Sequence, residues 1–263
     1  MKRLSFILSA ALLWGFLPRA GADDWTGLGS GLPAAAAEFT ASPPAPLFRA
    51  EGPRRLICVD AGHPNSFNSG LQPVSGTNET HINWQVALKL ERILKERGFD
   101  VLMTKTAELQ YVENKERALM ANRGGAALCV HLHCESTPGT GFAIYYPDRQ
   151  GVYEYKNDPD NGFKGPSGQV MTDSRALAEA MRKGMAQGLA GSLSDGGVRG
   201  DSRTQVGANQ GALTFSIFSK IPTITIEMAV LTNPRDARFI KSEAGQEKTA
   251  QAIAAGILLY RAP

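Results

Sequence analysis

The stretches LICVDAGH at residues 56–63 and INWQVALKLERILKERGFDVLM at residues 82–103 decide the fold of this chain. The first is a short apolar run with a polar, glycine-containing end, which is typical of a buried strand. In the second, apolar side chains recur at helical spacing until Gly98, and the apolar run at 101–103 then predicts another strand. A strand, a helix and a strand in this order favour parallel pairing, with the helix packed on the sheet.

The same alternation continues to the C-terminus. We therefore expect an α/β fold class, a single mostly parallel twisted sheet of about six strands with helices on both faces. Residues 147–172 break the alternation with three prolines and four glycines, and we expect an irregular insertion there. The remaining predicted strands are 127–133, 141–146, 215–218 and 223–228, and the remaining predicted helices are 113–122, 174–189 with Ser174 as its cap, and 246–260.

Residues 1–22 have the pattern of a signal peptide. Lys2 and Arg3 precede an apolar stretch at 4–17, and the small residues Ala20-Gly21-Ala22 form a cleavage site. The apolar stretch is shorter than the roughly 20 residues that span a bilayer, which favours export over anchoring. No later stretch is long and apolar enough to span a bilayer. We therefore expect an exported protein, periplasmic or secreted, without stable membrane insertion.

The mature chain is expected to be neutral. Removing the three basic residues of the signal peptide leaves 25 basic against 25 acidic residues, so bulk charge gives no support to nucleic-acid binding. Residues 23–54 are rich in Ala, Pro and Gly and are predicted to be a tail or linker before one domain at 55–263. Three cysteines do not make a disulfide scaffold, and Cys58 and Cys129 are expected to be small buried apolar side chains.

Three predicted strands end in groups that bind metals or move protons. They lead to His63, to His133 and to Glu227, while Glu79 opens the first predicted helix. The carboxyl ends of parallel strands meet at one edge of a sheet, where ligands gather. Two imidazoles and one carboxylate leave a zinc ion an open position for water, as hydrolytic sites require. Glu227 could then move the proton, or it could be an ordinary solvent-facing residue in an alternating strand.

Five segments taken together resemble the zinc-dependent N-acetylmuramoyl-L-alanine amidases, which are hydrolases of the bacterial cell wall. The resemblance runs in order from about residue 55 to the C-terminus. The segments are ICVDAGH at 57–63, NETHINWQVALKLERILKERGFDVLMTK at 78–105, ERALMANRGGAALCVHLHCES at 116–136, GFAIYY at 141–146 and IPTITIEMAVLTNPRDARFI at 221–240.

The resemblance implies a role for each candidate residue. His63, Glu79 and His133 correspond to the ligands of one Zn²⁺ per chain, and Glu227 corresponds to the catalytic glutamate. It also implies the substrate, which is the amide bond between N-acetylmuramic acid and L-alanine of the peptidoglycan stem. Arg199 in GVRGDSR resembles a segment near the family's site and is a candidate substrate contact, although a surface arginine would fit the sequence equally.

The two other histidines are weaker candidates for the metal. His131 shares a strand face with His133 and takes the place of a serine in the family's motif, so both could face the metal. The strand-end position and the resemblance favour His133. His81 follows Glu79 by two residues and would lie on a different face of the helix start. The chain also departs from the family's pattern at Pro64, Cys134-Glu135 and Val230.

Other functions are consistent with parts of the sequence. A non-haem iron oxygenase also uses two histidines and a carboxylate, but the alternating helices disagree with its usual barrel. A zinc peptidase acting on another amide, or a non-catalytic peptidoglycan-binding module, would keep the fold. The segment 147–172 is too short and too rich in Pro and Gly to form a long helical plug over the site, so no activator protein is implied, and Tyr153 and Tyr155 could line a groove instead.

Overall fold

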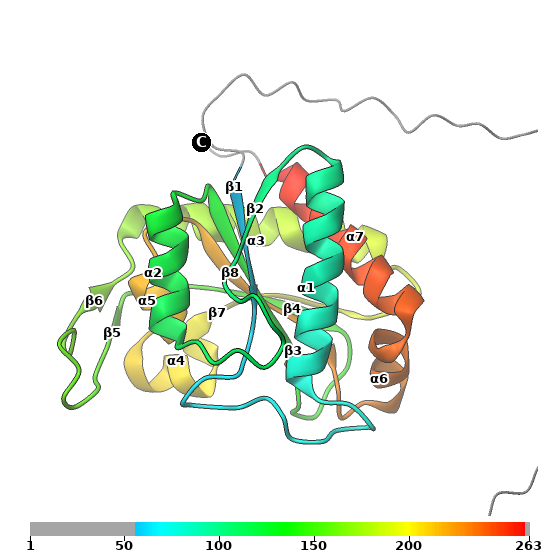
Figure 1. Ribbon diagram of the computed structural model, residues 1–263, viewed down its shortest axis with the longest axis horizontal. Coiled ribbons are helices and arrows are strands. Elements are labelled where there is room, and N and C mark those ends of the chain that lie inside the picture. Colours follow the sequence, from blue (N-terminus) through cyan, green and yellow to red (C-terminus); the bar gives the residue numbers. More distant parts are fainter. Residues whose placement is uncertain (1–55, 261–263) are drawn as a thin grey trace, which may run out of the picture. The chain divides into compact units, whose positions relative to one another are not determined.

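A computed structural model describes residues 56–260 of the chain (Figure 1). The predicted signal peptide at 1–22 and the predicted linker at 23–54 lie outside the described residues. Among the residues that the structure describes, no helix combines the length and the apolar character that a membrane span needs.

The centre of the domain is one six-stranded sheet with the order β2-β1-β3-β8-β4-β7. Pairing is parallel from β2 to β8 and between β4 and β7, while β4 pairs with β8 antiparallel. The expected α/β fold with a mostly parallel six-stranded sheet is therefore confirmed. The strands are β1 (Leu56–Ala61), β2 (Asp100–Met103), β3 (Leu128–Glu135), β4 (Phe142–Tyr146), β7 (Asp195–Gly200) and β8 (Thr223–Val230).

Helices cover both faces of the sheet, but unequally (Figure 1). The larger apolar core lies under three long helices, and a smaller core lies under two short ones on the opposite face. The first group is α1 (Glu79–Glu96), α3 (Gly168–Gly188) and α7 (Glu243–Leu259), with α6 (Pro234–Lys241) beside α7. The second is α2 (Asn114–Gly124) and α5 (Thr214–Phe218), and η1 (Asp201–Arg203) and α4 (Gln205–Gln210) precede α5.

The histidines of β3 lie on the face of the sheet that carries the smaller apolar core. Val130 and Leu132 belong to the larger core, whereas Cys129 belongs to the smaller one. Because successive side chains of a strand point to opposite faces, His131 and His133 lie on the same side as Cys129. All three cysteines of the chain are buried and free, as expected for small apolar side chains.

The structure corrects several predicted elements. The predicted strand at 215–218 is helix α5, because a short buried run with three apolar residues in four positions fits either element. The sixth strand is instead β7, whose adjacent glycines gave no strand signal. Helix α3 begins at Gly168 and is capped by Ser167, not by Ser174, whose hydroxyl oxygen accepts from the backbone N–H of Thr223 at 2.9 Å.

The predicted insertion contains more regular structure than expected. It forms a two-stranded hairpin of β5 (Gly151–Val152) and β6 (Lys164–Gly165), and its last residues are the first turn of α3. Helix α7 also begins earlier than predicted, at Glu243, where the side chain of Ser242 caps it. Helix α6, absent from the prediction, starts with the helix signature of Asn233 as cap and proline in the first turn.

Candidate active site

The site begins where β1 turns out of the sheet. Gly62 donates its backbone N–H to the carbonyl of Leu132 (2.9 Å), and a Cβ on Gly62 would overlap the ring of His133. His63 follows with a left-handed backbone (φ 62°), and its carbonyl accepts from the buried ammonium of Lys105. The Nδ1–H of His63 donates to the carbonyl of Asn68 (2.9 Å), which leaves the Nε2 lone pair free for a metal.

Glu79 is the first residue of α1, after a cap in which the side chain of Asn78 accepts from the backbone N–H of His81 (2.9 Å). Its carboxylate lies between two imidazoles: Oε2 is 3.2 Å from His63 Nε2, and Oε1 is 2.7 Å from His133 Nδ1. Burial raises the pKa of this carboxyl, but its contacts with the imidazoles of His133 and His63 outweigh the burial and hold the pKa well below its usual range. Glu79 is therefore ionised.

His133 is the third member of the cluster and comes from the carboxyl end of β3. Burial, with the neighbouring His131 as the next cause, lowers the pKa of His133 to about 4, so the imidazole is neutral at pH 7. Neutral imidazole and ionised carboxylate are the protonation states that ligate metals. One ligand atom each from His63, Glu79 and His133 lies within 4.8 Å of the other two.

Glu227 reaches the same place from β8, where it pairs in register with His133. Its Oε2 is buried and has no hydrogen-bond partner among the described residues. Burial, and then the charges of Glu79 and Glu135, raise the pKa of Glu227 well above its usual range. A carboxyl with a raised pKa beside a metal-ligating cluster is suited to taking up and returning a proton.

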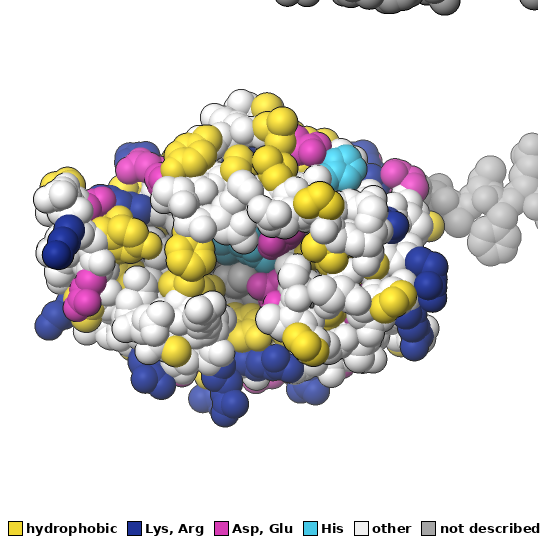
Figure 2. Space-filling view, turned by 90° about the horizontal axis from the view of Figure 1, so that it is seen from below, with side chains coloured by type: hydrophobic (Ala, Val, Ile, Leu, Met, Phe, Trp, Pro, Cys, Tyr) yellow, Lys and Arg dark blue, Asp and Glu magenta, His cyan; other side chains and the backbone are white. Residues whose placement is uncertain are grey.

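A cleft of about 970 Å³ opens over these four residues. Figure 2 shows this face, with histidine and acidic side chains at the floor of the hollow. Its walls include Tyr153 and Tyr155, which stack at 4.7 Å between ring centroids, and also Arg199. The Arg199 guanidinium lies over the ring of Tyr145, 6.0 Å from its centroid, and donates to its hydroxyl at 3.3 Å.

The structure thus gathers His63, Glu79, His133, Glu227 and Arg199 in one cleft. The four residues at its floor come from the turn after β1, from β3 and β8, and from the start of α1; β8 continues to Val230, past the strand end that the sequence predicts at 228. His81 lies outside the cluster and pairs with Glu108 at 3.1 Å.

Sequence reasoning missed the buried charges behind the cluster. Asp60 accepts hydrogen bonds from Arg117 Nη1 (2.8 Å) and from Thr104, and all three side chains are buried. Arg117 also donates to the carbonyls of Ala61 and Pro64 and so fixes the turn that carries the first histidine. A charged residue inside an apolar strand run was the only signal of this network in the sequence.

The donor set fits a zinc ion. Two imidazoles and one ionised carboxylate bring ligand atoms within 4.8 Å of one another, and Glu227, with its unpartnered oxygen, lines the same cleft. Hydrolytic zinc sites use three protein ligands of this kind and keep another position open.

Comparison with known proteins relates the whole domain to one family. The family described as N-acetylmuramoyl-L-alanine amidase matches residues 57–258. The amidase AmiA of Salmonella typhimurium is 24% identical over 233 residues, which cover 82% of this chain and 79% of AmiA. A sporulation-specific N-acetylmuramoyl-L-alanine amidase of Bacillus subtilis is 36% identical over a shorter stretch of 99 residues, 35% of this chain and 36% of the relative.

Solved structures have the same fold. The catalytic domain of CwlV, an amidase of Bacillus (Paenibacillus) polymyxa, superposes with a TM-score of 0.59 at 25% identity and covers 78% of this chain and 97% of the domain. The apo form of Ami1 from Mycobacterium abscessus superposes with a TM-score of 0.62 at 21% identity, over 78% of this chain and 98% of Ami1.

Proposed function

Because this chain belongs to the N-acetylmuramoyl-L-alanine amidase family, we propose that it is a zinc-dependent hydrolase of the bond between N-acetylmuramic acid and L-alanine in peptidoglycan. The observation that carries the proposal is the convergence of His63, Glu79 and His133 beside Glu227 at the floor of one cleft. A non-catalytic peptidoglycan-binding module would have no need to keep a carboxyl with a buried, unpartnered oxygen next to such a cluster.

The residues divide the chemistry between them. The two histidines and Glu79 would hold the zinc ion, which supplies polarisation of the scissile carbonyl and activation of water. Glu227 takes the proton of the attacking water with its carboxylate and returns it to the departing amine of L-alanine. Its raised pKa suits both halves of this transfer, because the carboxyl holds a proton readily between the two events.

The cleft, with a volume of about 970 Å³, provides room for the substrate over the cluster. Arg199 is placed in its wall, and its guanidinium can bind carbonyl or carboxylate oxygens of the peptide stem. The predicted signal peptide at 1–22 supports export, so we place the enzyme in the periplasm or outside the cell. There it would take part in cell-wall remodelling, daughter-cell separation or lysis.

The test is the composition of the muropeptides released from purified peptidoglycan. Mass spectrometry should find stem peptides with a free L-alanine amino group, and a chelator should stop their release. We expect Glu227→Gln to lower turnover by about 10²- to 10⁴-fold, the usual contribution of a general acid–base, while zinc stays bound near one per chain. His63→Ala and His133→Ala should lose both zinc and turnover.

His81→Gln is the matched control, because this histidine lies outside the cluster. It should keep both zinc and activity. Loss of zinc from Glu227→Gln would show that the glutamate is a ligand instead, and release of fragments cut at another bond would contradict the assignment of the substrate.

A further inference from the structure

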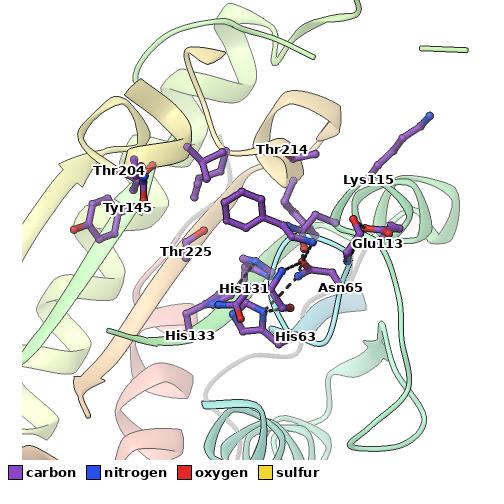
Figure 3. A pocket seen from close by; sticks show the side chains of 18 of the residues that line it. His63, Asn65, Glu113, Lys115, His131, His133, Tyr145, Thr204, Thr214 and Thr225 are labelled. Carbon is purple, nitrogen blue, oxygen red and sulfur yellow. Dashed lines mark hydrogen bonds between the residues drawn. The ribbon is translucent and has the colours of Figure 1, made fainter. Parts of the chain in front are cut away.

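His131 lies beside His133 in the cleft (Figure 3). Each of its ring nitrogens has a polar partner. Its Nε2 is 2.7 Å from Nε2 of His133, and its Nδ1 contacts Oδ2 of Asp60. The ring is 4% exposed and stacks on Phe215, so it has little freedom to turn away. The proposed function gives this residue no role.

The proton positions follow from the partners. The carboxylate of Asp60 is an acceptor, because its Oδ1 already accepts from the buried guanidinium of Arg117 (2.8 Å) and from the hydroxyl of Thr104. Nδ1 of His131 must therefore donate to it. Nδ1 of His133 faces Glu79 and the rest of the cluster at 2.7 Å, so a metal bound there leaves the ring proton of His133 on Nε2, which faces Nε2 of His131 at 2.7 Å. The N–H between the two rings then belongs to Nε2 of His133.

The packing of the His133 ring supports the same nitrogen as the metal ligand. If Nε2 carries the proton, Nδ1 carries the lone pair, and Nδ1 is the atom 2.7 Å from Glu79. The opposite edge of the ring is closed, because a Cβ on Gly62 would overlap both Nε2 and Cε1. The hydrogen bonds and the packing thus agree on the same nitrogen.

Asp60, at the end of this chain of hydrogen bonds, is itself held in place by buried partners. Arg117 donates from Nη1 to Oδ1 of Asp60 at 2.8 Å, and Thr104 donates to the same oxygen. The other carboxylate oxygen is left to His131. Both Asp60 and Arg117 are fully buried, so neither exchanges this contact for water.

We propose that His131 and Asp60 are positioning residues that act through His133, holding its ring with Nδ1 toward the zinc ion and Nε2–H toward His131. This rests on the proposed zinc site. His131 is not a further ligand in this arrangement, since the cluster of atoms mutually within 4.8 Å contains His63, Glu79 and His133 without it. Partners of this kind behind a ligating histidine typically contribute 10- to 100-fold in metal affinity.

The direct test is nitrogen NMR of the tag-free, zinc-loaded protein. The chain has four histidines, so long-range ¹H–¹⁵N spectra can be assigned with one variant for each ring. We expect His133 to be protonated at Nε2 and metallated at Nδ1, and His131 to be protonated at Nδ1. Metallation of His133 at Nε2, or of His131 at either nitrogen, would overturn the inference.

Zinc affinity provides an independent measurement. His131→Leu removes the acceptor at nearly constant size and should weaken zinc binding by about 10- to 100-fold. His131→Gln offers a carbonyl oxygen to the His133 N–H and should recover most of this loss. His81→Leu is the same exchange at the histidine outside the cluster, and it should bind zinc as the wild type does.

The outcomes separate this inference from the function on which it rests. Equal zinc affinity of wild type and His131→Leu would overturn the positioning role while leaving the zinc enzyme intact. A wild-type protein that binds no zinc would overturn the proposed function and the inference together. If His131→Leu does not fold, the tautomers of the wild type still decide the question.

Discussion

At the scale of single residues, the metal-binding cluster requires a residue without a side chain at position 62, next to the ring of His133. A Cβ at this position would overlap the His133 ring and lie 2.7 Å from the carbonyl oxygen of Leu132. Both neighbours belong to β3 in the middle of the sheet and have little room to move. Gly62 therefore allows β1 and the ligating histidine of β3 to approach each other.

We predict that Gly62→Ala destabilises the protein by about 1–3 kcal/mol, the usual cost of overpacking, and weakens zinc binding because His133 is displaced. Chemical denaturation and zinc titration measure the two effects. Gly168→Ala is the control, because a Cβ there meets no atom within 4 Å. A Gly62→Ala protein with wild-type zinc affinity would show that the ring tolerates displacement.

Glu227 is the residue whose charge the fold disfavours. Its pKa is raised in the folded protein, mainly by burial. The carboxyl therefore favours the folded state below the pKa of the unfolded chain, near pH 4, and this advantage is lost as the pH rises through the folded-state value. A glutamine at the same position has no charge to bury.

We accordingly expect zinc-free Glu227→Gln to match the wild type in free energy of unfolding near pH 4 and to exceed it increasingly toward pH 8. Urea denaturation in the presence of a chelator at several pH values measures the difference. A difference that stays constant with pH would mean that Glu227 titrates normally.

At the scale of elements, the hairpin of β5 and β6 forms one wall of the cleft without filling it. Lys115 of α2 holds it by an ion pair with Asp158 (2.7 Å), and Tyr153 and Tyr155 line the cleft. The floor residues His63 and Glu227 still border the open volume of about 970 Å³. The segment between β4 and α3 therefore does not plug the active site.

We predict that the purified enzyme hydrolyses peptidoglycan without an added activator protein, as measured by loss of turbidity of wall suspensions. The comparison is a variant whose residues 153–163 are replaced by a Gly-Ser loop, which leaves β5, β6 and α3 in place. An inactive wild type that gains strong activity from this replacement would show that the hairpin is inhibitory.

At the scale of the whole molecule, the catalytic domain has to reach the cell wall. The small residues Ala20-Gly21-Ala22 after the apolar stretch predict cleavage before Asp23. N-terminal sequencing of the exported protein should find a chain that starts at Asp23. Such a chain has equal numbers of acidic and basic residues. An exported chain that still starts at Met1 would contradict both the cleavage and the neutral charge.

The sequence by itself determined the order of strands and helices and the chemical types at the strand ends. Apolar runs of β1, β3 and β8 are each followed or ended by a ligand or proton carrier. The parallel order of these strands then brings their carboxyl ends to one edge, because parallel strands share a direction. This is why His63, His133 and Glu227 could be predicted together from local patterns.

Only the tertiary structure decided which short segments became strands and which partners the buried charged side chains have. Residues 215–218 are helical and β7 is a strand because packing against neighbours, not local propensity, settles short segments. The partners of Asp60 lie at Arg117 and His131, 57 and 71 residues along the chain. No local pattern encodes such separations, so the orientation of His133 depends on contacts that exist only in the folded domain.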